Sequence, residues 1–157
     1  MAEIVVRRGG AGDIEPAFAV WRAAETARRG GPPPRVSEER VRGYARRARA
    51  SLLVAEGGGG GLVGMALLTP ATSRPADISV LQMVFVSPER WGEGIGGRLV
   101  DAALAEARSE GYARCQLWTR ASDERVRRLY EGRGFGRSGR QQTGESGEQI
   151  VHYDRPL

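Results

Sequence analysis

The sequence predicts one domain in which helices and strands surround a single sheet, an α+β or α/β fold. Three observations lead to this prediction. The chain has 157 residues, which suits one domain covering residues 1–157 with a substantial core. Segments of strand-like composition alternate with segments that repeat apolar residues at helical spacing. A glycine-rich turn joins one such strand directly to one such helix within residues 84–100.

The first third of the chain predicts one strand followed by two helices. Residues 3–7 (EIVVR) are a short strand candidate. Asp13 is a candidate N-cap for a helix that continues as far as the GGPPP segment at 30–34. Ser37 is expected to cap a second, arginine-rich helix that reaches Arg49.

The rest of the chain predicts three strands, a helix, a strand, a second helix and two closing strands. The first two strands flank five consecutive glycines, which are typical of a hairpin loop. The polar, glycine-rich residues 136–147 are expected to form a mobile loop. The expected elements are strands at 51–56, 62–69 and 77–86, a helix at 94–110, a strand at 114–119, a helix at 123–132, and strands from Phe135 and over 149–154.

The junction at residues 84–100 is the most informative stretch. Its loop has glycines at 92, 94, 96 and 97, and a helical pattern of apolar residues begins at Ile95. Such a junction directs unpaired backbone N–H groups and the positive end of the helix dipole at one point, which suits a phosphate. Glycine is required because side chains would block the approach of phosphate oxygens. We therefore predict a phosphate cradle at residues 92–97.

Two other phosphate-binding loops fit this stretch less well. A P-loop has lysine and then serine or threonine after its last glycine, whereas Arg98 and Leu99 follow here. A dinucleotide fingerprint has GxGxxG near the first strand and an acidic residue at the end of the second strand. Here the spacing is GxGxGG, far along the chain, and Asp101 lies within the helix. A glycine-rich turn that binds no ligand remains the alternative from the loop alone.

The string VSPERWGEGIGGRL at residues 86–99 resembles the signature of the GCN5-related N-acetyltransferases, the GNAT family. That signature is a strand ending in Val-x-Pro-Glu, followed by Gln or Arg, two residues, Gly, one residue, and Gly or Ala. Trp91 stands where Gln or Arg is usual. Residues 123–135 (DERVRRLYEGRGF) resemble a second family segment, in which Tyr130 matches and Asp123 replaces the usual Asn. Two ordered matches are much harder to obtain by chance than either one alone.

The resemblance implies a mixed, mostly antiparallel sheet with helices on both faces, and acetyl-CoA as cosubstrate. Residues 92–97 would bind the pyrophosphate, and the pantetheine arm would extend the sheet along a splayed strand edge. A main-chain N–H near Val84 would polarise the acetyl carbonyl, and Tyr130 would protonate the leaving thiolate. The implied cofactor-binding residues are Val84, Phe85, Val86, Trp91, Gly92, Glu93, Gly94, Ile95, Gly96, Gly97 and Asp123.

The implied activity is transfer of an acetyl group to the primary amine of a small molecule or peptide. The residues leave the general base open among Asp77, Glu25 and His152. In this family the first two helices and the loops at the sheet end face the substrate, which here indicates Trp21, Glu25, Arg28, Tyr44 and residues 136–147. A non-catalytic module of the same fold that binds CoA is the alternative.

Composition argues against other classes of protein. The net charge is +5, but all 24 basic residues are arginine and they are spread over the chain, so we expect no nucleic-acid partner. No apolar run is long enough to span a membrane, and the amino-terminal residues lack a signal peptide, which predicts a cytoplasmic protein. The single cysteine, Cys115, is expected in the core, and no metal site is expected. An exposed final strand could pair with a second copy as a homodimer.

Overall fold

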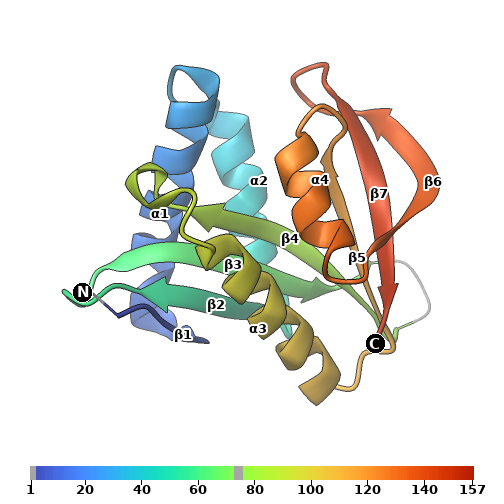
Figure 1. The fold of residues 1–157 in the computed structure, drawn as a ribbon, viewed down its shortest axis with the longest axis horizontal. Helices are drawn as coiled ribbons and strands as arrows, with labels where there is room; N and C mark the ends of the chain where they lie inside the picture. Colours follow the sequence, from blue (N-terminus) through green and yellow to red (C-terminus); the bar gives the residue numbers. More distant parts are fainter. Residues whose placement is uncertain (1–2, 73–75) are drawn as a thin grey trace.

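A computed structural model of the protein describes residues 3–72 and 76–157, which form one seven-stranded sheet with the strand order β1-β2-β3-β4-β5-β7-β6 (Figure 1). Neighbouring strands are antiparallel except β4 and β5, which are parallel. The elements are β1 (Val5–Arg8), η1 (Ala11–Asp13), α1 (Ile14–Arg29), α2 (Arg35–Ala45), β2 (Ser51–Glu56), β3 (Leu62–Pro70), β4 (Ile78–Val86), η2 (Pro88–Arg90), α3 (Ile95–Ser109), β5 (Arg114–Arg120), α4 (Glu124–Glu131), β6 (Gly136–Thr143) and β7 (Gln149–Pro156). The predicted order of helices and long strands is confirmed.

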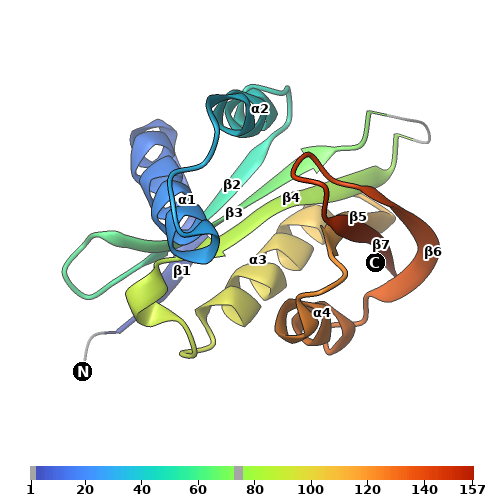
Figure 2. The same cartoon turned by 90° about the horizontal axis from the view of Figure 1, so that it is seen from above.

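The helices lie in two layers, one on each face of the sheet (Figure 2). On one face α1 and α2 cover β3 and β4, and their apolar residues form a cluster that includes Phe18, Trp21 and Met83. On the other face α3 and α4 bury a larger cluster that includes Leu99 and Tyr130. Helices on both faces of a mostly antiparallel sheet are what the family resemblance implied. Within the described residues, no helix is both long and apolar enough to cross a membrane.

Helix α3 approaches the sheet closely at Gly64 of β3. A Cβ atom on Gly64 would lie 2.8 Å from Leu99 Cδ1 and 3.2 Å from Ile95 Cγ2, so a side chain there would push α3 away. Because Ile95 begins the helix, this contact also fixes the position of the turn that precedes it.

Two helix boundaries differ from the prediction. Helix α2 begins directly after Pro34 and ends at Ala45, so Ser37 lies inside it and does not cap it. The Ser37 hydroxyl instead donates to Glu145 Oε2, at 3.3 Å, in the turn before β7. Asp13 does precede α1, but its carboxylate accepts from Arg7 and from the Gly10 N–H rather than from the first turn of the helix.

The prediction of a mobile loop at residues 136–147 is wrong. The strand predicted from Phe135 is the edge strand β6, which extends over residues 136–143 and pairs with β7. All eight residues are exposed, so the strand has neither a buried face nor the alternating pattern that would have indicated its length. Its pairing shifts register between Arg137 and Gln141, where Gly139 has a φ of 92°.

The two halves of the sheet separate between β4 and β5. These strands pair only where residues 78–80 face residues 114–116. Beyond that point the described strands give β4 no partner on this side, while β5 continues to pair with β7. We call the open edge of residues 81–86 the seam. An extra residue, Gln82, enters the pairing with β3 at the start of the seam, and such a bulge bends and twists a strand.

Candidate active site

The phosphate cradle is an exposed turn at the start of α3. Gly92 and Gly94 have φ values of 89° and 80°, a conformation that side chains disfavour, and Gly94 is the N-cap of α3. The first hydrogen bond of the helix runs from Arg98 N–H to Gly94 O, at 3.3 Å. Among the described residues, the N–H groups of 92–97 have no hydrogen-bond acceptor. The turn therefore presents the free N–H groups that an anion needs.

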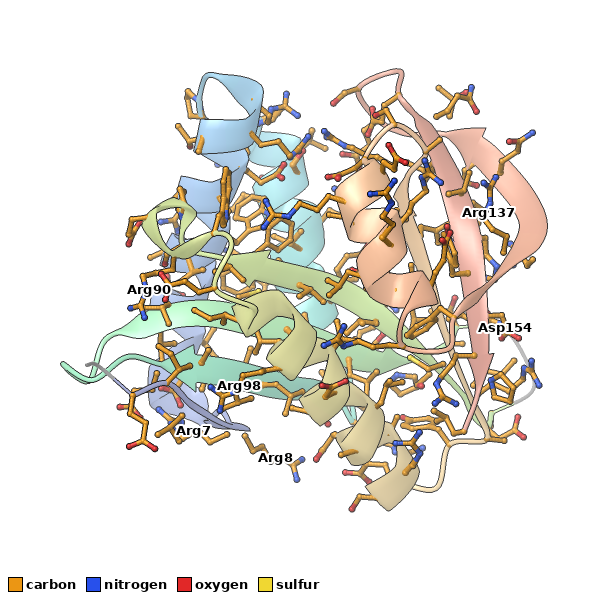
Figure 3. The ribbon with its side chains drawn as sticks, viewed as in Figure 1. Arg7, Arg8, Arg90, Arg98, Arg137 and Asp154 are labelled. Carbon is orange, nitrogen blue, oxygen red and sulfur yellow. The ribbon has the colours of Figure 1, made fainter. Side chains whose placement is uncertain are left out.

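Arginines surround this turn. Arg90 lies in the loop before α3, where it pairs with Glu93 at 2.9 Å, and Arg98 follows on the first turn of the helix (Figure 3). Arg125 of α4 reaches over the loop, with its Nη2 only 3.7 Å from where a Gly92 Cβ would lie. This positive charge favours a polyanionic ligand. Sequence reasoning missed Arg125, because no spacing distinguishes it from the other arginines of α4.

Gly96 and Gly97 connect the cradle to its surroundings. The Arg133 guanidinium occupies the place where a Gly97 Cβ would lie, and its Nε donates to Gly97 O at 3.1 Å. A Cβ on Gly96 would lie 3.7 Å from Leu129 Cδ2 and 3.9 Å from Val86 Cγ2. The cradle is thus adjacent to the end of the seam at Val86.

The direction of the main-chain groups along the seam follows from the pairing of β4 with β3. Ser87 N–H donates to Val63 O at 2.8 Å, so Ser87 directs its main-chain groups towards β3. Main-chain groups alternate sides along a strand. Phe85 therefore also faces β3, whereas Val84 and Val86 direct their N–H and C=O groups into the seam. Of residues 84–86, only the two valines offer main-chain groups to a ligand there.

Trp91 covers part of this edge. Its indole Nε1 donates to the Val86 carbonyl oxygen at 2.8 Å, while the residue stays 48% exposed. Trp91 and Trp118 have different surroundings. Trp118 does pack, against the His152 ring at 4.9 Å between centroids. Trp91 instead lies on the surface beside the cradle.

Tyr130 lies on α4 in the core beneath the sheet. It is 7% exposed and its ring packs edge-on against Phe135, with 5.7 Å between centroids. Burial raises the pKa of its phenol, and the nearby Cys115 and Asp123 raise it further, so the hydroxyl keeps its proton at neutral pH. Asp123 Oδ1 accepts from Val126 N–H at 3.1 Å and so caps α4. Asp123 thus has a structural role whether or not it contacts a ligand.

The three candidate bases occupy different surroundings. Asp77 directly precedes β4, and Val84 lies seven residues further along the strand, roughly 23 Å away. The Glu25 carboxylate is bound by Arg28, with Oε1 2.6 Å from Nη2. His152 is 3% exposed, and its Nδ1 lies 2.7 Å from Ser138 Oγ. Burial and the nearby Arg140 lower the pKa of His152, which favours the neutral imidazole that can accept a proton.

A polar surface lies on the face of β5 and β7 opposite α3 and α4. Trp118 pairs with His152 and Gln116 pairs with Asp154, so these four side chains share that face. No helix of the described residues covers it (Figure 2). The turn between β6 and β7 closes one end, because Glu145 Oε1 lies 2.9 Å from Arg40 Nε of α2.

One of the expected substrate-facing residues, Trp21, is placed differently. Trp21 is 2% exposed and belongs to the apolar cluster between α1 and the sheet, so it does not face a substrate. The Tyr44 ring is half-buried and contacts the guanidinium of Arg47, at 5.0 Å from the ring centroid. Cys115 is fully buried, as predicted, and burial raises the pKa of its thiol to about 11. Within residues 3–72 and 76–157, no three His, Cys, Asp or Glu residues are grouped to hold a metal ion.

Two hollows lie near the candidate site or elsewhere in the fold. One of about 470 Å³ lies between α3 and the loop that follows α4 and is lined by Arg108, Arg133 and Arg155, and one of about 310 Å³ lies between α1 and β2. Neither includes a cradle glycine or a seam residue. The candidate site is an open strand edge that leads into a turn, a shape suited to an extended ligand.

Known proteins share this arrangement. A family model described as the acetyltransferase (GNAT) family matches residues 18–135. A curated relative from Escherichia coli, described as the uncharacterized N-acetyltransferase YjgM, is 36% identical over 76 residues, which are 48% of this chain and 46% of the relative. The match therefore spans just under half of that relative.

Solved structures share the fold over nearly the whole chain. The alanine N-acetyltransferase of a ribosomal protein from Escherichia coli has a TM-score of 0.79 and 19% identity, covering 99% of this chain and 94% of the other. A structure from Kribbella flavida described as GCN5-related has a TM-score of 0.80 and 19% identity, covering 98% of both chains. At this identity the likeness establishes the fold alone.

Proposed function

Because the chain belongs to the acetyltransferase (GNAT) family, we propose that it transfers an acetyl group from acetyl-CoA to the primary amine of a small molecule or peptide. One observation supports this most: the unpaired N–H groups of the cradle lie next to an open strand edge in the middle of the sheet. The contact between Gly96 and Val86 connects the two. Together they offer donors for a diphosphate and a ladder for an amide-containing arm.

The residues present fit acetyl-CoA, which supplies the activated thioester. The N–H groups of 92–97 would hold the pyrophosphate, with Arg90, Arg98 and Arg125 contributing positive charge. The main-chain groups of Val86 and the carbonyl of Val84 would pair with the amides of the pantetheine arm, which leaves the Val84 N–H for the acetyl carbonyl. Glu93 is held by Arg90, which keeps its carboxylate from the centre of the cradle.

The chemistry follows from the groups around the seam. The amine nitrogen forms a bond to the acetyl carbon while Val84 N–H donates to the carbonyl oxygen, which gains negative charge. The carbon–sulfur bond then breaks, and Tyr130 gives its proton to the sulfur. The proton lost by the amine passes to His152 or Glu25, directly or through water. Tyr130 regains a proton from solvent and the base releases one to solvent, which closes the cycle.

A second candidate is a module of the same fold that binds CoA without catalysis. The indole of Trp91 on the Val86 carbonyl favours it, since this contact competes with the pantetheine arm. The two functions differ in whether acetyl-CoA is consumed.

Release of free CoA thiol from acetyl-CoA, measured across a panel of amines, tests the proposal. The fully buried Cys115 leaves little background in such an assay. Thiol release that depends on one class of amine supports the proposed reaction. CoA binding without thiol release, over the whole panel, would favour the non-catalytic module. Failure to bind CoA at all contradicts both.

A further inference from the structure

The hydrogen bond of Trp91 uses an acceptor that the proposed function needs. Val86 is one of two residues that direct main-chain groups into the seam, and its carbonyl oxygen already accepts from the indole at 2.8 Å. A carbonyl can accept two hydrogen bonds. However, an indole ring bonded at this distance fills the space where a pantetheine amide would lie in ladder geometry.

The loop that holds Trp91 is built so that the indole can leave. Trp91 follows the short η2 turn, to which it is tied by a weak 3.2 Å bond from its N–H to Pro88 O. The next residue is Gly92, with a φ of 89° and no side chain. Nearly half of the Trp91 surface is already exposed, so little buried area is lost when the ring moves outward.

We propose that Trp91 is a latch on the seam, whose indole occupies the Val86 carbonyl until the pantetheine arm of CoA displaces it. This inference rests on the proposed function. Affinity for CoA is then reduced by the cost of opening the latch.

Two probes separate the latch from CoA binding itself. CoA contains the pantetheine arm, whereas adenosine 3′,5′-bisphosphate carries the adenosine and phosphate groups without that arm. The latch predicts that Trp91→Phe, which keeps a ring but removes the donor, binds CoA about three- to tenfold more tightly, as expected from the loss of one competing hydrogen bond. It predicts equal affinity of both proteins for adenosine 3′,5′-bisphosphate. Isothermal titration calorimetry measures the four dissociation constants, one for each of the two ligands with the wild type and with Trp91→Phe.

The indole N–H gives a direct readout in wild-type protein. The chain has three tryptophans, and Trp91→Phe identifies the NMR signal of Trp91, leaving those of Trp21 and Trp118 as internal references. CoA should shift the Trp91 indole signal and speed its exchange with solvent, and adenosine 3′,5′-bisphosphate should not.

An unchanged Trp91 signal in a protein that is saturated with CoA would overturn the latch and leave the proposed function standing. Equal or weaker CoA binding by Trp91→Phe would overturn it as well. Absence of CoA binding to both proteins would reject the proposed function, and the latch with it.

Discussion

Tyr130 and Tyr153 are neighbouring core tyrosines whose hydroxyl groups have different partners. Their ring centroids are 6.5 Å apart. The Tyr153 hydroxyl donates to Glu131 Oε2 at 2.6 Å, whereas the Tyr130 hydroxyl has no hydrogen-bond partner among the described residues. The Tyr130 hydroxyl therefore makes no hydrogen bond within the described residues that would stabilise the fold, which is consistent with a role in chemistry.

This contrast predicts opposite effects of two matched substitutions. Tyr130→Phe should lower kcat roughly 10²- to 10⁴-fold, the usual loss when a general acid is removed, with little change in Tm. Tyr153→Phe should keep kcat but lose about 1 kcal/mol of unfolding free energy with its hydrogen bond. Steady-state kinetics and urea denaturation of both variants measure this. An unchanged kcat in Tyr130→Phe would show that the residue only packs α4 against the sheet.

His152 predicts how stability depends on pH. Burial and Arg140 lower its pKa in the folded protein, while Asp154 opposes them. As pH falls through about 6.5, the unfolded chain binds a proton that the folded protein does not, so unfolding becomes easier. The free energy of unfolding should therefore decrease between pH 7 and 5.5. Carboxylates such as Asp154, whose pKa is lowered by Arg114, lose their contribution only at lower pH.

His152 is the only histidine, so a His152→Gln variant tests this prediction cleanly. Urea denaturation at pH 7, 6.5 and 5.5 should give a nearly constant free energy of unfolding for the variant and a falling one for the wild type. If the free energy of unfolding of the wild type increased as the pH fell from 7 to 5.5, this result would contradict the proposed environment of the imidazole.

Single residues could be predicted from the sequence where a motif fixed them. The glycine turn at residues 92–97 followed from the first signature match, whereas the role of Tyr130 stays a prediction. The contact of Trp91 with Val86 could not be predicted, because it depends on how the loop folds back onto the strand. Arg133 was missed for a similar reason: its contact with Gly97 joins segments 36 residues apart.

At the level of elements, helix α3 allows the cradle to be tested against a matched control. Gly94 and Gly111 flank its two ends with φ values of 80° and 84°, and a Cβ on either would meet no atom within 4 Å. A valine at either position would therefore clash with no neighbouring atom. It would carry the same backbone strain at both positions, about 1–2 kcal/mol. Only the valine at position 94 would project beside the N–H groups of the cradle.

We predict that Gly94→Val and Gly111→Val lose similar stability but differ in CoA binding. Gly94→Val should weaken CoA binding roughly tenfold or more, because it obstructs several charge-assisted N–H contacts at once. Gly111→Val should bind CoA as the wild type does. Calorimetric titration with CoA, alongside thermal denaturation, makes the comparison. Equal CoA affinities in the two variants would exclude residues 92–97 as the phosphate site.

Elements could be predicted from the sequence where burial imposes a pattern. The strands β2 to β5 and the helices α1 and α3 carry apolar residues at strand or helix spacing, because each has a face in the core. β6 has no buried residue, and only main-chain pairing with β7 makes it a strand. Likewise, the end of α2 is not marked by glycine or proline, so its last turn could not be predicted.

At the scale of the whole molecule, the seven-stranded sheet consists of two parts that are joined by a short stretch of pairing between β4 and β5. Strands β1 to β4 form one part and β5, β7 and β6 the other, and of the residues that the structure describes only 78–80 and 114–116 pair as strands across them. Sequence patterns could not reveal this separation, since β4 and β5 both read as ordinary buried strands. The seam arises from the register of β4, including the extra residue Gln82, and register is a tertiary property.

The seam predicts a pattern of amide hydrogen exchange along residues 83–86 that would not occur if β4 were paired on both sides. The amides of Met83 and Phe85 are paired with β3 and should exchange slowly, whereas those of Val84 and Val86 face the seam and should exchange faster, although all four lie in a central strand. Addition of acetyl-CoA should slow the two valines selectively, because its pantetheine arm and its acetyl carbonyl would supply the missing partners. Residue-resolved exchange by NMR, with and without acetyl-CoA, measures the difference. Uniformly slow exchange along residues 83–86 in the free protein would mean that β4 has a partner on both sides, and an acyl donor could not then lie between the halves of the sheet.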